Sequence, residues 1–521
     1  MSHAQSLPPV IERLLDPSFY PHPVEHLELI QTHVSWVVLT GPYAYKVKKP
    51  VDFGFLDFST LEKRQHFIAL ELTLNRRLAP DLYLEVLPVR TDPQGNLELG
   101  GDEGDRPIVE YVLKMVQFPQ SHLLDRLLSE NKVEPQWIDA LADRVARFHQ
   151  DAPTGKAIAS FGAPERVREN IRQNFEQSRH LVERGRVDAA AFDAFERWSE
   201  AFFVDHDETF RQRAERGHIR ECHGDLHSGN IAVWDGNLQV FDCIEFNEPF
   251  RFIDTISDLA FLVMDLRFRG RPDLAIRVLN RYLAHTGDTE ALVLLPLYES
   301  YRAHVRAKVA GFMVQGGDES QGVQAARYLE YAMQVTHPRT PRIVGIFGLS
   351  GTGKSSVAAS LAEAGQAIWL RSDTIRRQVA GLELTARTNS ALNHNLYAAD
   401  MTAKTYAELF RQAGDVVAAG LPVIVDATFL EQEGREALHG VAKRFGVPLD
   451  WVWTDLPPHL AEERIVQRSA AGADPSEATV EVYRAQRMRF DPLQNLEDRV
   501  WRQETTQPID ADALWRRIEA G

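Results

Sequence analysis

The sequence has little cysteine, no long apolar run and no excess of positive charge. Its two cysteines, Cys222 and Cys243, are too few for a disulfide framework and suit a reducing cytoplasm. The longest apolar runs, such as ALVLLPLY, are far shorter than a membrane span, and the first 20 residues lack the apolar core of a secretory signal. A net charge of −16 argues against a general grip on DNA or RNA, which needs a basic surface. We therefore expect a cytoplasmic protein that binds neither membranes nor nucleic acid.

The length and the pattern of the chain predict several folding units. At 521 residues the chain is too long for one hydrophobic core. Residues 32–115 are rich in strand-like segments, and helical periodicity follows over 120–220 and from 253 to about 335. After a stretch with two prolines at 336–342, strands and helices alternate, which predicts a doubly wound parallel sheet. We predict three parts, at 1–115, 116–337 and 341–521.

The stretch CHGDLHSGN, residues 222–230, carries side chains suited to phosphoryl transfer. This reaction needs a carboxylate beside the acceptor hydroxyl and ligands for the magnesium ion on the phosphates. Asp225 is placed for the first task. Asn230 and Asp242 are candidates for the second, since a catalytic loop and a short hairpin fit between Asp225 and Asp242.

A lysine that reaches the α- and β-phosphates from a strand, held by a glutamate on a helix, completes such a site. Lys46 in YAYKVKK and Glu71 in ALELTLN fit these positions. Lys48 points to the same strand face as Lys46, so the choice between them stays open, although we favour Lys46. No G-x-G-x-x-G loop precedes Lys46, which argues against a true protein kinase.

With these motifs, residues 25–335 resemble the aminoglycoside phosphotransferase and choline-kinase branch of the protein-kinase-like fold, which uses H-G-D-x-x-x-x-N. The resemblance implies an α+β fold with two lobes, 1–115 and 116–337, the second of which carries the catalytic loop. It also implies ATP with Mg²⁺ as the donor and the hydroxyl of a small molecule as the acceptor. Asp225 would then be the base, and Asn230 and Asp242 the metal ligands.

A second phosphate-binding motif lies in RIVGIFGLSGTGKSSVAASLAEA, which reads as a strand, a glycine-rich loop and a helix. Such a loop directs backbone N–H groups at the β-phosphate from the start of a helix. Lys354 is expected to reach the β- and γ-phosphates, and the hydroxyl of Ser355 to bind magnesium. The residues expected to contact ATP are Gly348, Ser350, Gly351, Thr352, Gly353, Lys354, Ser355 and Ser356.

Two carboxylates follow predicted strands of the same region. Asp373 comes at the carboxyl end of the strand in WLRSD, beside the phosphate loop, where it can accept the proton of a substrate hydroxyl. A helix cap is the alternative for Asp373. Arg376 or Arg377 can hold an anionic substrate. Asp426 ends the strand in VIVDATF and is expected to hold magnesium through water.

Arg464 and Arg468 stand four residues apart on one predicted helix face, ahead of a polar segment that contains glycine and proline. This arrangement is typical of a mobile lid whose arginines offset charge on the transferring phosphoryl group. Solvated helix charges are the alternative.

Residues 341–521 resemble the P-loop kinases grouped with polynucleotide kinase, zeta toxins and chloramphenicol phosphotransferase. The motifs GLSGTGKSS, SDTIRR and IVDATF and the lid arginines carry this resemblance, which implies phosphorylation of a hydroxyl with Asp373 as the base. The order of the two halves resembles bacterial fusions described as aminoglycoside phosphotransferase/ATP-binding proteins.

We therefore expect a multidomain phosphotransferase that uses ATP and Mg²⁺ at two kinase-type sites, on hydroxyl groups of small molecules or nucleotides. Two alternatives stay open. One half, more readily the amino-terminal one, is a nucleotide sensor that regulates the other half without turnover. Alternatively, the carboxy-terminal half phosphorylates polynucleotide ends.

Overall fold

The computed structural model describes residues 7–101, 106–384, 398–471, 479–490 and 499–520, without the side chains of 468–471. The chain forms two compact units. The first comprises Met1–Trp137, Asp151–Val167 and His206–Asp258, and the second comprises Ile138–Gln150, Arg168–Asp205 and Leu259–Gly521. These units divide the chain differently from the predicted parts, whose boundaries stay predictions.

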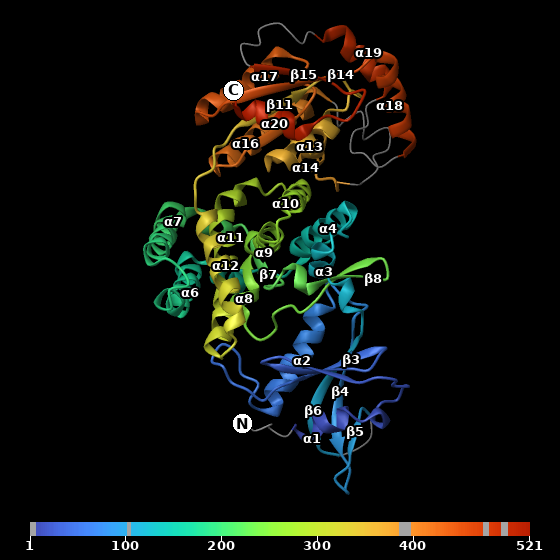
Figure 1. The fold of residues 1–521 in the computed structure, drawn as a ribbon. Helices are drawn as coiled ribbons and strands as arrows, with labels where there is room; N and C mark the ends of the chain where they lie inside the picture. The colour runs from blue at the N-terminus through green and yellow to red at the C-terminus, as the bar shows by residue number, and fades with distance from the viewer. Residues whose placement is uncertain (1–6, 102–105, 385–397, 472–478, 491–498, 521) are drawn as a thin grey trace. The chain divides into compact units, whose positions relative to one another are not determined.

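A six-stranded antiparallel sheet dominates the start of the first unit (Figure 1), in the order β1-β2-β3-β6-β4-β5. β3 carries Lys46 and lies between β2 and β6. The predicted helix that carries Glu71 is α2, which packs Ile68 against Tyr83 and Leu113 of the sheet. The bounds are β1 (Glu28–Gln31), β2 (Ser35–Leu39), β3 (Tyr43–Lys48), α2 (Leu61–Asn75), β4 (Tyr83–Thr91), β5 (Leu97–Leu99) and β6 (Ile108–Val116), with a short α1 (Pro9–Leu14) ahead of them.

The predicted catalytic loop leads into the predicted short hairpin. The loop follows β7 (Ile219–Glu221), which pairs with β10 (Phe252–Asp254). The hairpin consists of β8 (Ile231–Trp234) and β9 (Asn237–Val240). Asn230 therefore stands just before β8, and Asp242 stands two residues after β9.

The segments with helical periodicity form helices, as predicted. Apolar residues three and four apart bury one side of α4, in which Ile138, Leu141 and Val145 are fully buried, whereas α9 is buried on all sides over residues 255–266. No helix among the described residues is long and apolar enough to cross a membrane. The helices are α3 (Leu124–Ser129), α4 (Pro135–Asp151), α5 (Lys156–Ala159), α6 (Pro164–Glu183), α7 (Ala189–Glu215), α8 (Glu248–Arg251), α9 (Thr255–Phe268), α10 (Pro272–Thr286), α11 (Leu295–Gln315) and α12 (Gly322–Val335).

The alternating segments after residue 341 form a five-stranded parallel sheet, as predicted, in the order β12-β13-β11-β14-β15. β13, which ends at Asp426, lies between β11 and β12, so one strand separates the strand before Asp373 from the strand that enters the phosphate loop. The strands are β11 (Ile343–Phe347), β12 (Ile368–Arg371), β13 (Val423–Asp426), β14 (Leu449–Asp455) and β15 (Arg499–Glu504).

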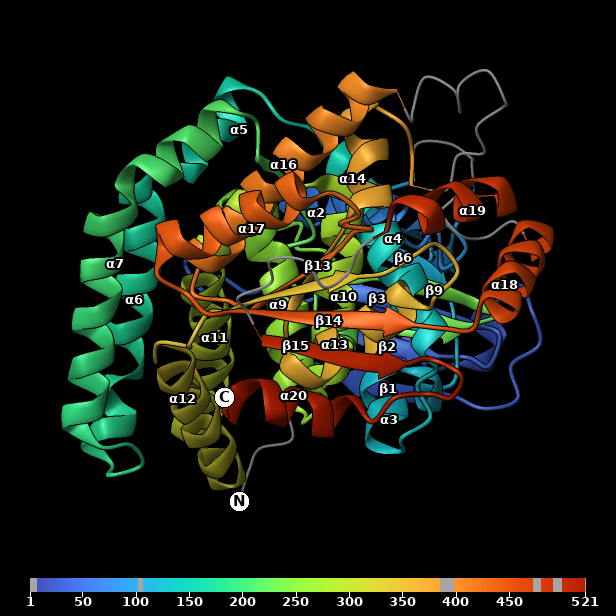
Figure 2. The ribbon, with the colours of Figure 1, turned by 90° about the horizontal axis from the view of Figure 1, so that it is seen from above.

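Helices cover both faces of this sheet, which explains why β11 is buried along its whole length. α13 and α20 pack on one face around Val344, Ile424 and Trp515, and α16 and α17 lie on the other (Figure 2). The bounds are α13 (Lys354–Gly365), α14 (Ser372–Val379), α16 (Ala399–Ala418), α17 (Gln432–Phe445), α18 (Pro458–Ala471), α19 (Val480–Arg489) and α20 (Ala511–Ala520).

Candidate active sites

In the first unit, Lys46 joins two carboxylates that are far away in sequence. Its Nζ lies 2.7 Å from Glu71 Oε1 and 2.9 Å from Asp242 Oδ1. Burial by itself would lower the pKa of Lys46, but Asp242 and Glu71 outweigh this effect and hold the pKa well above its usual value. The side chain is therefore a permanent cation in contact with a candidate metal ligand.

Lys48 lies deeper than Lys46, with 1% of its side chain exposed. It donates a 2.7 Å hydrogen bond to Glu71 Oε2 and another to Glu245. Although burial opposes it, the two lysines hold the pKa of Glu71 down at about 2. Both partners of Lys48 are buried carboxylates, whereas Lys46 reaches Asp242, so the contacts favour Lys46 as the phosphate lysine. Its role stays a prediction.

The catalytic loop brings the proposed base and a proposed metal ligand into contact. Asn230 Nδ2 donates to Asp225 Oδ2 at 2.9 Å and to the Asp225 carbonyl at 3.0 Å. His227 Nε2 lies 3.5 Å from Asp225 Oδ2, and 34% of the Asp225 side chain is exposed. The carboxylate is therefore fixed in orientation while part of it faces solvent, which a base for an incoming hydroxyl requires.

Asp258 holds this loop in place, although the sequence pattern did not single it out. Its fully buried carboxylate accepts from the backbone N–H groups of His223 and Gly224, each at 2.9 Å. His223 Nδ1 accepts from the Asp225 N–H, and its Nε2 donates to the Phe241 carbonyl. Burial lowers the pKa of His223, so the ring is neutral, and its hydrogen bonds to the backbone give it a structural role. The sequence could have pointed to Asp258, because it is an acidic residue inside the apolar stretch TISDLAFLV.

Asp242 has a backbone conformation that residues other than glycine rarely adopt. Its φ is +62°, and its N–H donates to the Tyr83 hydroxyl at 3.1 Å, while the next N–H, that of Cys243, donates to Asn75 Oδ1 at 2.8 Å. A non-glycine residue in the left-handed region costs free energy and persists where its surroundings fix it. These contacts leave the Asp242 side chain 49% exposed beside Lys46, which suits a ligand for a metal ion.

In the second unit, the phosphate loop requires glycine for steric reasons. Gly348 has φ +147°, and a Cβ there would lie 2.5 Å from Thr454 Oγ1 and 2.6 Å from its carbonyl oxygen. Gly351 has φ +80°, and a Cβ would lie 2.7 Å from the carbonyl oxygen of Ala461. Both neighbours include backbone atoms, which cannot move aside, so only glycine lets the loop adopt this shape.

Hydrogen bonds within the phosphate loop, and from it to Thr505 and Gln486, also hold its shape. Lys354 Nζ and Thr352 Oγ1 donate to the Leu349 carbonyl, at 2.9 and 2.8 Å. The Thr352 carbonyl accepts from Thr505 Oγ1 at 2.7 Å, and the Ser350 N–H donates to Gln486 Oε1 at 3.0 Å. Thr352 is thus buried by contacts that support the loop, and its predicted contact with ATP stays a prediction.

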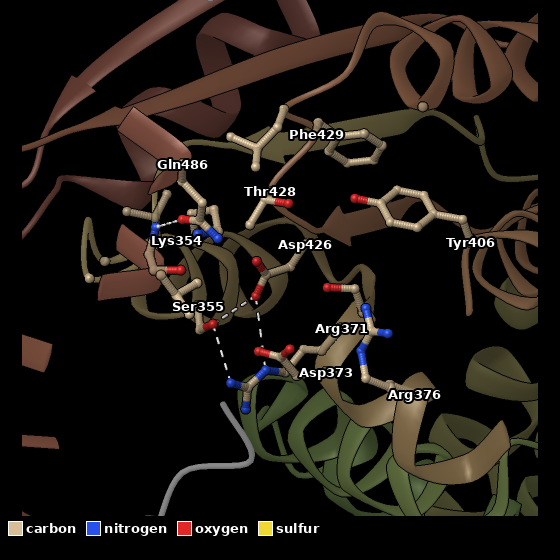
Figure 3. Close-up of a pocket in the computed structure, with 18 of the residues that line it drawn as sticks. Lys354, Ser355, Arg371, Asp373, Arg376, Tyr406, Asp426, Thr428, Phe429 and Gln486 are labelled. Atoms are coloured by element: carbon tan, nitrogen blue, oxygen red, sulfur yellow. Dashed lines mark hydrogen bonds and ion pairs between the residues drawn. The ribbon is translucent and has the colours of Figure 1, made fainter. Parts of the chain in front are cut away.

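Ser355 and Asp426 meet beneath the loop (Figure 3). Ser355 Oγ donates to Asp426 Oδ2 at 2.8 Å. Arg371 Nη2 donates to Ser355 Oγ at 3.3 Å, and Arg371 Nε lies 3.9 Å from Asp426 Oδ2. Burial raises the pKa of Asp426, and Arg371 and Lys354 oppose this effect. A hydroxyl and a carboxylate oxygen are the ligands that Mg²⁺ prefers, so these two residues fit the predicted metal site.

One cavity of about 1730 Å³ joins the loop to the predicted base. Asp373 stands in the first turn of α14 and lines this cavity together with Arg376, whose Nη1 donates to Thr402 Oγ1 at 3.2 Å. Of the described residues, the lining includes Arg376 but not Arg377. The predicted loop residues that line it are Ser350, Gly351, Gly353, Lys354, Ser355 and Ser356.

The predicted lid is described only at its base. Arg464 on α18 lines the cavity, and its Nη2 donates to the Thr505 carbonyl at 2.7 Å. Arg468 lies on the same helix, but its side chain is outside the described part, as are residues 472–478 of the predicted lid.

Comparison with known proteins matches both halves to families. Residues 98–301 match the model of the phosphotransferase enzyme family, and residues 343–493 match that of an AAA domain. These matches confirm the predicted fold class, an α+β kinase-like fold followed by an α/β P-loop fold. Both domains are therefore of a phosphotransferase or kinase type.

Some solved structures are also similar to part of the chain. A putative kinase from Chloroflexus aurantiacus is 22% identical over 35% of this chain and 96% of its own, with a TM-score of 0.29. A gluconokinase from Sinorhizobium meliloti is 22% identical over 35% of this chain and 91% of its own, with a TM-score of 0.24. Similarity at this level says nothing about the substrate.

Relatives that match most of the chain occur in mycobacteria. Uncharacterised proteins from Mycobacterium tuberculosis and Mycobacterium bovis are 30% identical to the chain over 464 residues, which is 88% of this chain and 90% of theirs. The chain therefore belongs to the same family as these mycobacterial proteins, and it carries a phosphotransferase-family domain followed by a P-loop kinase domain.

Proposed function

We propose that the protein is an ATP- and Mg²⁺-dependent phosphotransferase with two active sites, each of which phosphorylates a hydroxyl group of a small molecule or a nucleotide. The observation that carries the proposal is that each site gathers a lysine, a candidate metal carboxylate and a partly exposed second aspartate. In the first unit these are Lys46, Asp242 and Asp225. In the second they are Lys354, Asp426 and Asp373 around one cavity.

In the first site, Asp225 would take the proton of the acceptor hydroxyl at its Oδ1 or Oδ2, while Asn230 keeps the carboxylate in place. Lys46 would bind the phosphates of ATP, with Glu71 holding the ammonium group. Asn230 and Asp242 are the side chains that would hold Mg²⁺. When bound, Mg²⁺ and ATP supply the phosphoryl group and the positive charge that offsets its transfer.

In the second site, the glycine loop and Lys354 would bind the phosphates of ATP, and Ser355 and Asp426 would hold Mg²⁺. Asp373 would take the proton of the acceptor hydroxyl. Arg464 is placed on the cavity wall, where it would offset charge on the phosphoryl group.

The cavity gives the polynucleotide alternative little support. A nucleic-acid end needs an excess of positive charge along its path. In the described lining, the basic side chains Lys354, Arg371, Arg376, Arg464 and Arg489 stand beside the acidic side chains Asp373, Asp426, Glu431 and Glu433. The aromatic rings of Tyr406, Phe410 and Phe429 line the same cavity and contact one another. This mixture suits a small acceptor.

Separate Asp225→Asn and Asp373→Asn variants test the proposal, with ATP consumption measured across a library of hydroxyl-bearing metabolites. We expect each variant to lose about 10²- to 10⁴-fold of turnover for one set of acceptors and to keep the other set. Loss of all turnover in Asp373→Asn and none in Asp225→Asn would contradict two catalytic sites and favour the sensor alternative for the first unit.

A further inference from the structure

We propose that α10 is needed for turnover at the P-loop site. Asn280 on α10 and Gln378 on α14 are positioning residues: their contacts hold β12 and α14, and thereby Asp373, in the arrangement needed for turnover. The proposal rests on the proposed role of Asp373. α10 precedes the P-loop region by about 60 residues, yet it belongs with that region to the second compact unit.

Three contacts from successive turns of one face of α10 reach three elements of the P-loop region. Arg277 Nη1 lies 3.2 Å from Glu363 Oε1 on α13, the helix that begins at Lys354. Asn280, one turn later, contacts β12 at the edge of the sheet. The carbonyls of Leu283 and Ala284, one turn later again, contact α14. Residues three and four apart share a helix face, so α10 lies along the P-loop region as one surface.

Asn280 takes the place of a neighbouring strand. Its Nδ2 donates to the Ala367 carbonyl at 3.1 Å, and its Oδ1 accepts from the Trp369 N–H at 2.8 Å. Among the described strands, β12 lies at the edge of its sheet, so no strand there pairs with its outer N–H and C=O groups. One amide side chain therefore satisfies a donor and an acceptor of this edge, two residues ahead of Arg371, where β12 ends.

Gln378 fixes the helix that carries Asp373. Its Nε2 donates to the Leu283 carbonyl at 3.1 Å and to the Ala284 carbonyl at 2.9 Å. Its Oε1 accepts from Gln412 Nε2 on α16, at 3.2 Å. These carbonyls belong to the last turn of α10, which carries the negative end of the helix dipole, and the Leu283 carbonyl also accepts from the Gly287 N–H at 2.8 Å. The amide therefore has partners for all its groups and one orientation only.

The side-chain amides of Asn280 and Gln378 support the side of the cavity where the acceptor is proposed to bind. α14 supplies Asp373 and Arg376, and Arg376 in turn donates to Thr402 on α16. The glycine loop, in contrast, is held by Thr454, Thr505 and its own backbone. Loss of the Asn280 and Gln378 contacts is therefore expected to displace the base more than the glycine loop. α10 itself is held by α4, since Arg277 and Arg281 pair with Asp139 and Asp143.

The test uses full-length protein with Asp225→Asn, MgATP as the probe and water as the acceptor, so that phosphate release reports the P-loop site. Gln378→Glu places an anion against the negative end of α10, whereas Gln378→Lys keeps a donor there with a favourable charge. We expect Gln378→Glu to lower phosphate release at least tenfold, with ATP affinity at the Lys354-dependent site changed less than threefold. Gln378→Lys is expected to stay within threefold of the parent protein. Gln324→Glu, the same change on an exposed face of α12, serves as the matched control and is expected to leave release unchanged.

A Gln378→Glu variant as active as its parent, or a Gln378→Lys variant as impaired as Gln378→Glu, would overturn the inference. If the parent protein releases no phosphate, the proposed function has failed, and backbone hydrogen exchange over residues 368–379 decides this inference. Exchange at least tenfold faster in Gln378→Glu, but not in Gln378→Lys, supports it; unchanged exchange in Gln378→Glu overturns it. Asn280→Ala, expected to speed exchange in the same segment, replaces Gln378→Glu if that variant does not fold.

Discussion

The two candidate sites handle charge in different ways. The site of the first unit is built from ion pairs between side chains 25 and 196 residues apart, with Lys46 already bound to Glu71 and Asp242. The phosphate loop of the P-loop site consists of nine consecutive residues whose backbone shape is set by glycine. The first site therefore depends on ionisation, and the second depends on backbone geometry. Substitutions that alter only one of these properties should affect only one site.

The largest expected effect is that of Gly348→Ala on ATP binding in the second unit. The new Cβ would meet the Thr454 carbonyl oxygen at 2.6 Å, so the loop has to change shape. Loss of two N–H bonds to a charged phosphate, each worth about 1.5–3 kcal/mol, weakens ATP about 10²- to 10⁴-fold. Calorimetric titration should then fall from two ATP equivalents to one. Gly440→Ala, where a Cβ meets nothing within 4 Å, is the control.

The next effect separates Lys46 from Lys48. Lys46→Met removes the cation beside Asp242 and should lower turnover at the first site about 10²- to 10³-fold, with the P-loop site unchanged. Lys48→Met leaves Glu245 buried, but burial already raises the pKa of Glu245, so this carboxyl can take up a proton instead. We expect Lys48→Met to lower stability and to keep most of the turnover. If Lys48→Met loses turnover and Lys46→Met keeps it, the assignment of the phosphate lysine is reversed.

The smallest of the three effects is a pH dependence confined to the first unit. Because the lysines lower the pKa of Glu71 from 4.5 to about 2, Glu71 contributes stability that is fully present above pH 4.5 and is lost as the pH falls towards 2. At about 1.36 kcal/mol per pH unit, the contribution is on the order of 3 kcal/mol. Urea unfolding of wild type and Glu71→Gln should therefore differ most near neutral pH and converge in acid.

The control for this pH dependence is Glu62→Gln, an exposed substitution in the first turn of the same helix, α2. Its difference from wild type should stay below about 1 kcal/mol at every pH. ATP binding at the P-loop site should not follow the Glu71 profile. A gap between wild type and Glu71→Gln that stays constant down to pH 2 would show that the lysines do not hold Glu71 ionised.

Prediction from the sequence went furthest where the residues concerned are consecutive. The phosphate loop was predicted residue by residue because strand, glycines, lysine and helix are consecutive, and Ser355 lies in contact with Asp426 as a shared metal site requires. The motif around Asp225 and Asn230 was found for the same reason. Asp258, Glu245 and Arg371 were missed because each acts across the fold, without a local motif of its own. The position of β12 at the edge of the sheet was not predicted, since periodicity predicts strands but not their order.

By itself, the amino-acid sequence determined which segments are strands and helices, that two phosphate-handling motifs follow one another, and which glycines shape the second. Those features depend on interactions within a few residues. Only the tertiary structure decided that Lys46 meets Asp242, that Asp258 holds the first loop, and that α10 supports the strand and helix leading to Asp373. Such contacts join distant parts of the chain, and buried charges and edge strands need partners that sequence spacing does not specify.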